Sequence, residues 1–293
     1  MGNRKGLSGP KRGLEVHNPR LEVALSPCPN DVYIFSALLL KKIPTFLDLK
    51  FVLEDIETLN QLAKKEKMDV IKASLAIWND LYQNYQLLEI GCALGFGVGP
   101  ILVGRKKFSL EEFPYLKIGI PGINTTAHFL FNFFYSGTIQ KVFLPYHEII
   151  PALLEKTIDL GILIHEGRFI FSKYNLCFIV DLGKVWESEN KVPVPLGGFF
   201  IKRSLNYEVK KEILRVFRAS LFWAQKNEEL IFPLLQTYAQ EMQKEVIKKH
   251  IETYVNENTF KLKDEGKKAL KVLAQLLGIK EDLKNLILEE ETL

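Results

Sequence analysis

Residues 91–100 read GCALGFGVGP, and the apolar run Ile101–Gly104 follows directly. Four glycines in this stretch indicate a backbone that takes dihedral angles other residues avoid. In a nucleotide-binding loop, such glycines open a helix whose first amides hold a phosphate. Here they open a predicted strand, so the stretch favours a crossover between two lobes over a nucleotide loop.

On both sides of this crossover, short apolar segments alternate with helical ones, which is typical of α/β layering with a largely parallel sheet. Strands are predicted at 21–25, 49–53, 69–72, 101–104, 116–120, 142–144, 159–164, 176–181 and 199–202. Helices are predicted at 31–41, 58–67, 75–82, 125–134 and 149–156. A second Pro/Gly-rich crossing at 193–198 returns the chain. We therefore predict one lobe from residues 21–104 and 196–293, and another from 105–195.

The remainder of the chain is predicted to be helical. Helices at 209–225, 228–239, 244–254 and 265–277 show apolar spacing with Lys and Glu on their outer faces. We expect them to support the first lobe without a part in chemistry, and we expect His250, among charged neighbours, to be solvated. Residues 1–20, rich in Gly, Lys, Arg and Asn, are predicted to be a flexible basic extension.

The charge balance and the cysteines exclude several classes of protein. The chain of 293 residues has 39 basic and 35 acidic side chains, an excess too small to indicate nucleic-acid binding. Its three cysteines are far apart, which argues against a disulfide framework and against a zinc site. No apolar run has the ~18 residues of a membrane span, and no secretory signal is visible. We expect a cytoplasmic protein without a bound metal.

His165 is the first candidate for chemistry. It follows the apolar strand predicted at 159–164, and the carboxyl ends of strands in open α/β sheets carry ligand groups. Because imidazole titrates near neutrality, a neutral histidine there can act as a base. Glu166 or Arg168 could orient its ring or bind an anionic group. The alternative is a histidine that is merely hydrogen-bonded in a turn.

The segment PGINTTA, residues 121–127, turns the chain from a strand into a helix. The free amides of a helix N-terminus, with the hydroxyls of Thr125 and Thr126, form a ready carboxylate site. The alternative is simple N-capping by Thr125. Both interpretations can hold together.

The segment SPCPND, residues 26–31, follows the first strand. Its two prolines restrict the loop, so that Ser26, Asn30 and Asp31 are expected to be held in place, with Asn30 or Asp31 capping the next helix. Cys28 invites an interpretation as a nucleophile. No basic residue flanks it in the sequence to lower the pKa of its thiol, so this interpretation is disfavoured.

Other polar residues complete the set of candidates. Lys72-Ala73-Ser74 end the third predicted strand and offer a cation and a hydroxyl at another carboxyl end. His147 and His128 rival His165 as a base, but neither ends a buried strand. A Gly-x-Ser-x-Gly nucleophile elbow is absent from the sequence.

Four of these segments, taken in order, resemble the 1,4-dihydroxy-6-naphthoate synthase family of the futalosine route to menaquinone. They are SPCPND at 26–31, PG and TTA within 121–127, HE and RF within 165–169, and DLG, WE and PLG within 181–197. The resemblance runs from about Leu21 to Gly198. It implies a periplasmic-binding-protein type II fold with a cleft between two α/β lobes. It also implies a carbon–carbon lyase that cleaves cyclic dehypoxanthinylfutalosine without an organic cofactor.

The resemblance further implies roles for particular residues. The family's catalytic base matches His165, and its substrate-contacting positions match Lys72, Ala73, Ser74, Thr126 and Ala127. The expected partner is a small anionic substrate with a carboxylate, and the sequence does not indicate an oligomeric state. The sequence departs from the family pattern at Asn124, Gly167, Val185, Asn190 and Lys191. These departures bear on rate and substrate fit more than on the class of reaction.

Two other functions remain open at this point. A solute-binding protein shares the implied fold, and fold does not fix function. The absence of a signal peptide weighs against this alternative. Chorismate dehydratase, a different lyase of the same pathway on the same scaffold, is the second alternative, and the SPCPND and PLG segments weigh against it.

Overall fold

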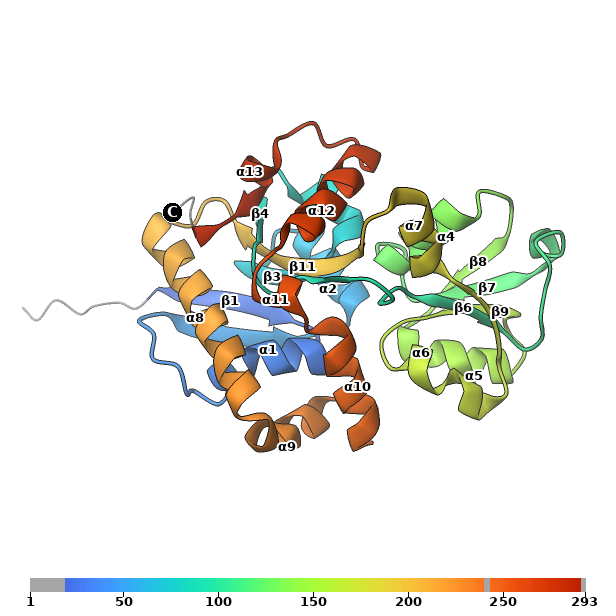
Figure 1. Cartoon of the computed structure of the whole chain (residues 1–293), viewed down its shortest axis with the longest axis horizontal. Coiled ribbons are helices and arrows are strands. Elements are labelled where there is room, and N and C mark those ends of the chain that lie inside the picture. Colours follow the sequence, from blue (N-terminus) through green and yellow to red (C-terminus); the bar gives the residue numbers. More distant parts are fainter. Residues whose placement is uncertain (1–18, 240–242, 291–293) are drawn as a thin grey trace, which may run out of the picture.

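The protein forms two lobes side by side, each built around its own β-sheet (Figure 1). The computed structural model describes residues 19–239 and 243–290. Of the predicted N-terminal extension, residues 1–18 lie outside the described residues.

A seven-stranded sheet forms the first lobe, on the left in Figure 1, with the strand order β12-β4-β11-β3-β1-β2 and β5 paired to β11. Its strands are β1 (Arg20–Leu25), β2 (Asp48–Leu53), β3 (Val70–Ser74), β4 (Tyr85–Leu88), β5 (Ala93–Gly95), β11 (Val194–Lys202) and β12 (Ile287–Leu288). β1 pairs in parallel with β2 and β3, while β11 runs antiparallel to β3, β4 and β5.

A five-stranded sheet forms the second lobe, with the order β10-β6-β9-β7-β8. Its strands are β6 (Ile101–Gly104), β7 (Lys117–Ile120), β8 (Gln140–Phe143), β9 (Leu160–Leu163) and β10 (Cys177–Asp181). β7 is parallel to β8 and β9, but β6 is antiparallel to β9 and β10. The predicted strands are present, but the expectation of a largely parallel sheet is wrong. β6 and β11, the strands that follow the two crossings, run opposite to the other strands of their sheets.

Helices cover both sheets and extend along the outside of the first lobe. They are α1 (Pro29–Leu39), α2 (Ile56–Lys64), α3 (Trp78–Leu81), α4 (Thr126–Phe134), α5 (Ile149–Leu154), α6 (Gly167–Ile170), α7 (Leu182–Asn190), α8 (Tyr207–Lys226), α9 (Glu228–Tyr238), α10 (Lys244–Tyr254), α11 (Glu257–Phe260), α12 (Asp264–Leu276) and α13 (Leu283–Leu286). α8, α9 and α10 all pack on α1, and α10 lies on the side of the first lobe that faces the second (Figure 1).

The chain passes between the lobes twice, and the two crossings meet. The first joins β5 to β6 through Phe96–Pro100, and the second leaves β10 through α7 and enters β11. A Cβ atom added to Gly99 would collide with the backbone of Gly183, and one added to Gly183 would collide with that of Gly99. The two crossings therefore depend on glycine at both positions for their close approach.

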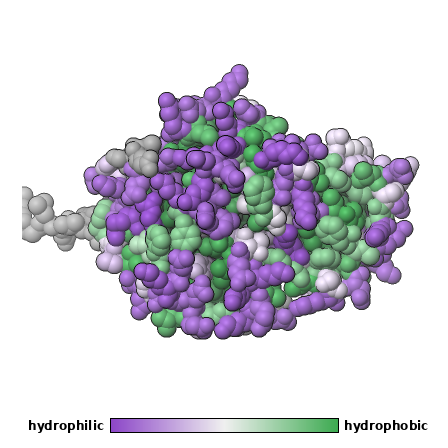
Figure 2. All heavy atoms as spheres, viewed as in Figure 1, coloured by the Kyte–Doolittle hydropathy of each residue, from purple (hydrophilic) through white to green (hydrophobic). Residues whose placement is uncertain are grey.

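Hydrophilic side chains dominate the face of the first lobe shown in Figure 2, and hydrophobic ones gather over the second lobe. Exposed hydrophobic residues of the second lobe include Leu110, Tyr115, Phe143, Leu154 and Phe178.

Within residues 19–239 and 243–290, no helix combines the length and apolar character needed to cross a membrane.

Candidate active site

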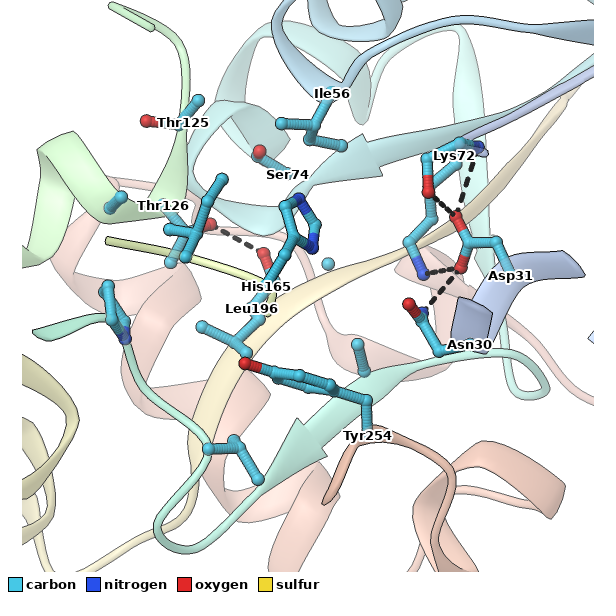
Figure 3. Close-up of a pocket in the computed structure, with 17 residues that line it drawn as sticks. Asn30, Asp31, Ile56, Lys72, Ser74, Thr125, Thr126, His165, Leu196 and Tyr254 are labelled. Atoms are coloured by element: carbon cyan, nitrogen blue, oxygen red, sulfur yellow. Dashed lines mark hydrogen bonds and ion pairs between the residues drawn. The ribbon is translucent and has the colours of Figure 1, made fainter. Parts of the chain in front are cut away.

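A cavity lies where the two lobes meet, and the residues around it come from both lobes (Figure 3). Nine of the residues predicted from the sequence line it: Ser26, Asn30, Asp31, Lys72, Ser74, Thr125, Thr126, Ala127 and His165. The sequence analysis did not assign the other lining residues to the site: Ile56, Ala93, Val98, Pro100, Ile164, Leu196, Gly197 and Tyr254. The lining therefore combines an apolar wall with a few convergent polar groups, as in small-molecule sites.

Asp31 is the centre of a buried polar network on the first-lobe side of the cavity. Its Oδ2 accepts hydrogen bonds from the Ser26 hydroxyl at 2.7 Å and the Ser26 amide at 3.2 Å. Its Oδ1 accepts one from the Asn30 amide nitrogen at 2.8 Å and pairs with Lys72 Nζ at 3.0 Å. The Asp31 side chain is 0% exposed and that of Lys72 is 6% exposed. A buried ion pair is tolerated when further hydrogen bonds satisfy it, and this one has them.

The expectation that Asn30 or Asp31 caps the helix is wrong. The N-cap of α1 is Cys28, and Pro29 occupies the first turn, where its missing N–H costs nothing. Asn30 and Asp31 therefore lie inside the helix, and their side chains are free to line the cavity instead (Figure 3).

His165 follows β9 and Ile164, and its φ of +51° places it in the left-handed region. A non-glycine residue in this region is uncommon, and such residues concentrate at functional sites. The Tyr146 ring and the imidazole pack in a T-shaped arrangement with ring centroids 5.0 Å apart. Burial lowers the pKa of His165 to about 4, and the negative charge of Asp31 opposes this only in part. The ring is therefore neutral near pH 7 and has a free lone pair.

The Cys28 sulfur lies 3.4 Å from Nδ1 and 3.6 Å from Nε2 of His165. Burial raises the pKa of the Cys28 thiol well above its usual value, and the nearby Glu166 raises it further. The sulfur therefore stays protonated, and it can accept the N–H of the neutral imidazole, which leaves the lone pair of the other ring nitrogen free. A protonated thiol is a poor nucleophile, in agreement with the disfavoured nucleophile interpretation.

The two threonines at the start of α4 are both engaged within the protein. The Thr125 hydroxyl accepts from the His128 amide at 3.2 Å, so it is the N-cap of α4, as the capping interpretation predicted. The Thr126 hydroxyl donates to the Leu196 carbonyl at 2.6 Å, and it accepts from the Ala76 amide at 3.4 Å. Thr126 thereby ties the second lobe to β11 and to the turn after β3. The amides of Thr126 and Ala127, in the first turn, have no partner within the helix.

Three of the predicted site residues do not line the cavity. Ala73 is on the face of β3 opposite to Lys72 and Ser74, because side chains alternate along a strand. Glu166 instead lines a second cavity, together with Tyr146 and His147. Arg168 donates to the Gly99 carbonyl at 2.6 Å and pairs with Asp181 at 3.4 Å, so it fastens the two crossings to each other.

The rival histidines lie away from the cavity. His147 is exposed on the second lobe. His128 is bonded through Nδ1 to the Ile123 carbonyl at 2.8 Å, and Lys141 Nζ lies 3.2 Å from its Nε2. Of the histidines within the described residues, His165 alone lines the cavity. In the same part of the chain, no cluster of three His, Cys, Asp or Glu side chains is arranged to hold a metal ion.

Helix α10 contributes two residues that the sequence analysis did not assign to the site. Tyr254 lines the cavity, and burial raises its pKa to about 12. His250 is 0% exposed, so the expectation that it is solvated is wrong. The signal lay in the spacing of Ile247, His250 and Tyr254, which share one buried face of an otherwise charged helix.

The sequence profile of a family described as menaquinone biosynthesis matches residues 21–278. A 1,4-dihydroxy-6-naphthoate synthase from Thermus thermophilus is 35% identical over 250 residues, which are 85% of this chain and 91% of the relative. A second protein of that name, from Streptomyces coelicolor, is 34% identical over 258 residues, covering 86% of this chain and 91% of the relative.

Comparison with solved structures identifies the fold. A crystal structure of a protein from Archaeoglobus fulgidus superposes with a TM-score of 0.84 at 32% identity, covering 90% of this chain and 99% of the other. The ligand-binding component of an ABC-type import system from Staphylococcus aureus superposes with a TM-score of 0.67 at 14% identity, covering 94% of this chain and 98% of the other. The second match shows the fold alone, and it confirms the predicted two-lobed architecture of periplasmic binding proteins.

Proposed function

We propose, from the premise that this chain belongs to the menaquinone biosynthesis family, that it is a 1,4-dihydroxy-6-naphthoate synthase. In this proposal it is a carbon–carbon lyase of the futalosine route, and it cleaves cyclic dehypoxanthinylfutalosine. The observation that carries the proposal is the neutral ring of His165, which faces the cavity between the lobes (Figure 3). The names of both curated relatives support the choice of product.

His165 is the proposed general base. It removes a proton from the sugar-derived ring of the substrate, and this starts the carbon–carbon cleavage that leads to the aromatic diol. A pKa of about 4 alone would make the imidazole a weak base. An anionic substrate beside the ring raises that pKa, because negative charge favours the imidazolium. Substrate binding therefore brings the pKa of His165 closer to the working pH.

The proposed site for the substrate carboxylate is the N-terminus of α4. The amides of Thr126 and Ala127 are free of partners in the helix, and the dipole of the helix favours an anion there. Lys72 adds a cation across the cavity, although its ion pair with Asp31 offsets part of its charge. Ser74 completes the polar side with its hydroxyl.

Lobe closure belongs to this proposal. The groups from β3 and α1 belong to the lobe formed by residues 21–104 and 196–293, while α4 and His165 belong to residues 105–195. Bringing the two sets together excludes water, and this strengthens the electrostatics around a proton transfer. A cytoplasmic location is also proposed, with support from three unpaired cysteines, two of them buried.

The function is tested by incubating the purified protein with cyclic dehypoxanthinylfutalosine and measuring 1,4-dihydroxy-6-naphthoate by liquid chromatography and mass spectrometry. The expected result is catalytic release of the naphthoate. Tight binding without product at high enzyme concentration would favour the solute-binding protein instead. Turnover of chorismate without turnover of the futalosine derivative would identify the sister lyase.

A further inference from the structure

His250 occupies an unusual position for a residue outside the cavity lining. Its imidazole is fully buried, its ring centroid is 5.9 Å from that of His165, and the two planes are 11° apart. The ring of Tyr254, which does line the cavity, packs on it at 4.7 Å. A buried histidine between two groups of the site is costly to place, so its hydrogen bonds are informative.

The bonds of Asn30 fix the tautomer of His250. Asp31 is surrounded by donors, including Lys72, so the group that Asn30 presents to it at 2.8 Å is the amide nitrogen. The carbonyl oxygen of Asn30 therefore faces His250, 3.0 Å from Nε2. An oxygen acceptor requires a donor, so Nε2 carries the proton. Burial lowers the pKa of His250 well below its usual value, and the ring is consequently neutral, with a lone pair on Nδ1.

That lone pair has no hydrogen-bond partner among the described residues. A buried acceptor without a partner costs about 1–3 kcal/mol. Such a cost is rarely kept at a position that only fills space, since an apolar side chain on the same helix face, like Ile247, avoids it. The feature that histidine supplies at position 250 is therefore the Nε2–H donor.

We propose that His250 is a positioning residue of the reaction, acting through Asn30 on Asp31 and Lys72. Its Nε2–H holds the Asn30 carboxamide in one orientation. The amide nitrogen of Asn30 then stays directed at Asp31, and Asp31 holds Lys72 at the cavity wall. Without this donor, the Asn30 carboxamide can rotate, so that its oxygen takes the place of its nitrogen beside Asp31. The Asp31 carboxylate can only accept hydrogen bonds, so this orientation breaks its bond with Asn30. This proposal rests on the proposed function for its kinetic measurement.

The experiment compares three substitutions in the full-length protein. Gln places its amide nitrogen close to where Nε2 of histidine stands, while Asn places one close to Nδ1, and Leu has no donor. We expect His250→Leu and His250→Asn to lower kcat by about 100-fold, the loss typical of a misplaced site group, and His250→Gln to recover most of it. Equal losses in the Gln and Asn variants would overturn the proposal, as would a folded Leu variant within twofold of wild-type kcat.

A double-mutant cycle tests whether the effect passes through Asn30. In an Asn30→Ala background, His250→Leu should cause no further loss of kcat, whereas multiplying losses would contradict the pathway. Ile247→Ala is the matched control, because it loosens the same buried face of α10 and its aliphatic side chain has no donor to give Asn30. It should lower Tm and leave kcat unchanged.

A spectroscopic measurement is independent of turnover. In protein labelled with ¹⁵N-histidine, the signals lost in His250→Leu should be those of a neutral ring protonated on Nε2. A ring protonated on Nδ1 would contradict the inference, whatever the substrate proves to be. A wild-type protein that does not turn over the futalosine derivative, yet shows the Nε2–H tautomer, would overturn the proposed function and not the hydrogen bond.

Discussion

The sulfur of Cys28 lies 3.4 Å from Nδ1 of His165, although 137 residues separate the two in the sequence. Cys28 stands at the N-terminus of α1 in the first lobe, and His165 follows β9 in the second. This contact therefore joins the lobes at the proposed base. The sulfur of the protonated thiol can accept the imidazole N–H, which fixes the orientation of the ring.

Cys28→Ala should lower kcat by about fivefold, because a hydrogen bond that orients His165 contributes about 1 kcal/mol. Cys28→Ser, which retains an acceptor at this position, should lose less. The control is Cys92→Ala, since Cys92 is also buried but its thiol donates to the Leu88 carbonyl. It should reduce Tm and leave kcat intact. An unchanged kcat in Cys28→Ala would show that the thiol does not orient His165.

Arg168→Leu should destabilise the protein by about 3 kcal/mol, because it leaves Asp181 buried without its cation. Urea unfolding measures this loss. Lys50→Met is the matched control: its partner is Glu22, and both side chains are well exposed, so the loss should stay under about 1 kcal/mol. Equal losses in the two variants would show that Arg168 does not fasten the crossings.

Gly99→Ala should cost at least about 2 kcal/mol, since its new Cβ meets the backbone of Gly183, which cannot move aside as a side chain can. Gly167→Ala is the contrasting variant, because its Cβ would meet only Leu163 at 3.5 Å. Its effect on the free energy of unfolding should stay within about 0.5 kcal/mol. A tolerated Gly99→Ala would contradict the close crossing of the two segments.

The free energy of unfolding should fall as the pH is lowered from about 6.5 towards 4. The pKa of His165 is about 4 in the folded protein and about 6.5 when unfolded, so the unfolded chain binds the extra proton in this range. Above about pH 6.5 the imidazole is neutral in both states, and His165 then costs the folded protein no stability. Below that pH, protonation in the unfolded chain alone lowers the free energy of unfolding by at most roughly 3 kcal/mol. His165→Asn should make the pH dependence less steep without abolishing it, as measured by urea unfolding at each pH, because burial also lowers the pKa of His250. An equally steep dependence in that variant would show that the folded pKa is not lowered.

Much of the fold follows from hydrophobic periodicity along the chain. The strands near 21–25, 49–53 and 101–104 and the helix 244–254 lie within a residue or two of their predicted bounds. β4 was missed because only Gln83 and Asn84 separate it from the helix predicted at 75–82. β11 begins five residues before its predicted start, because Pro195 was interpreted as a break between elements although it lies within the strand. Strand direction was mispredicted, since it depends on pairings between distant segments.

The candidate site was predictable where polar residues end a strand or begin a helix. His165, Lys72 and Thr126 stand at such positions, and the structure brings them to one cavity. His250 could not be found by that rule, because it lies mid-helix among lysines and its partner Asn30 is 220 residues away. Arg168 was assigned to the site but lies outside the cavity lining. Its contacts with Gly99 and Asp181 depend on the close approach of the two crossings, which the sequence does not show.

The most direct test of the central claim compares His165→Asn with His147→Asn. Each variant is mixed with cyclic dehypoxanthinylfutalosine, naphthoate release is followed over time, and substrate Kd is measured by calorimetry. The account predicts that His165→Asn loses at least about 100-fold in turnover, as expected for the loss of a general base, while its Kd stays within a few-fold of wild type. His147→Asn should remain active. An active His165→Asn variant, or an inactive His147→Asn beside it, would contradict the assignment of His165 as the base.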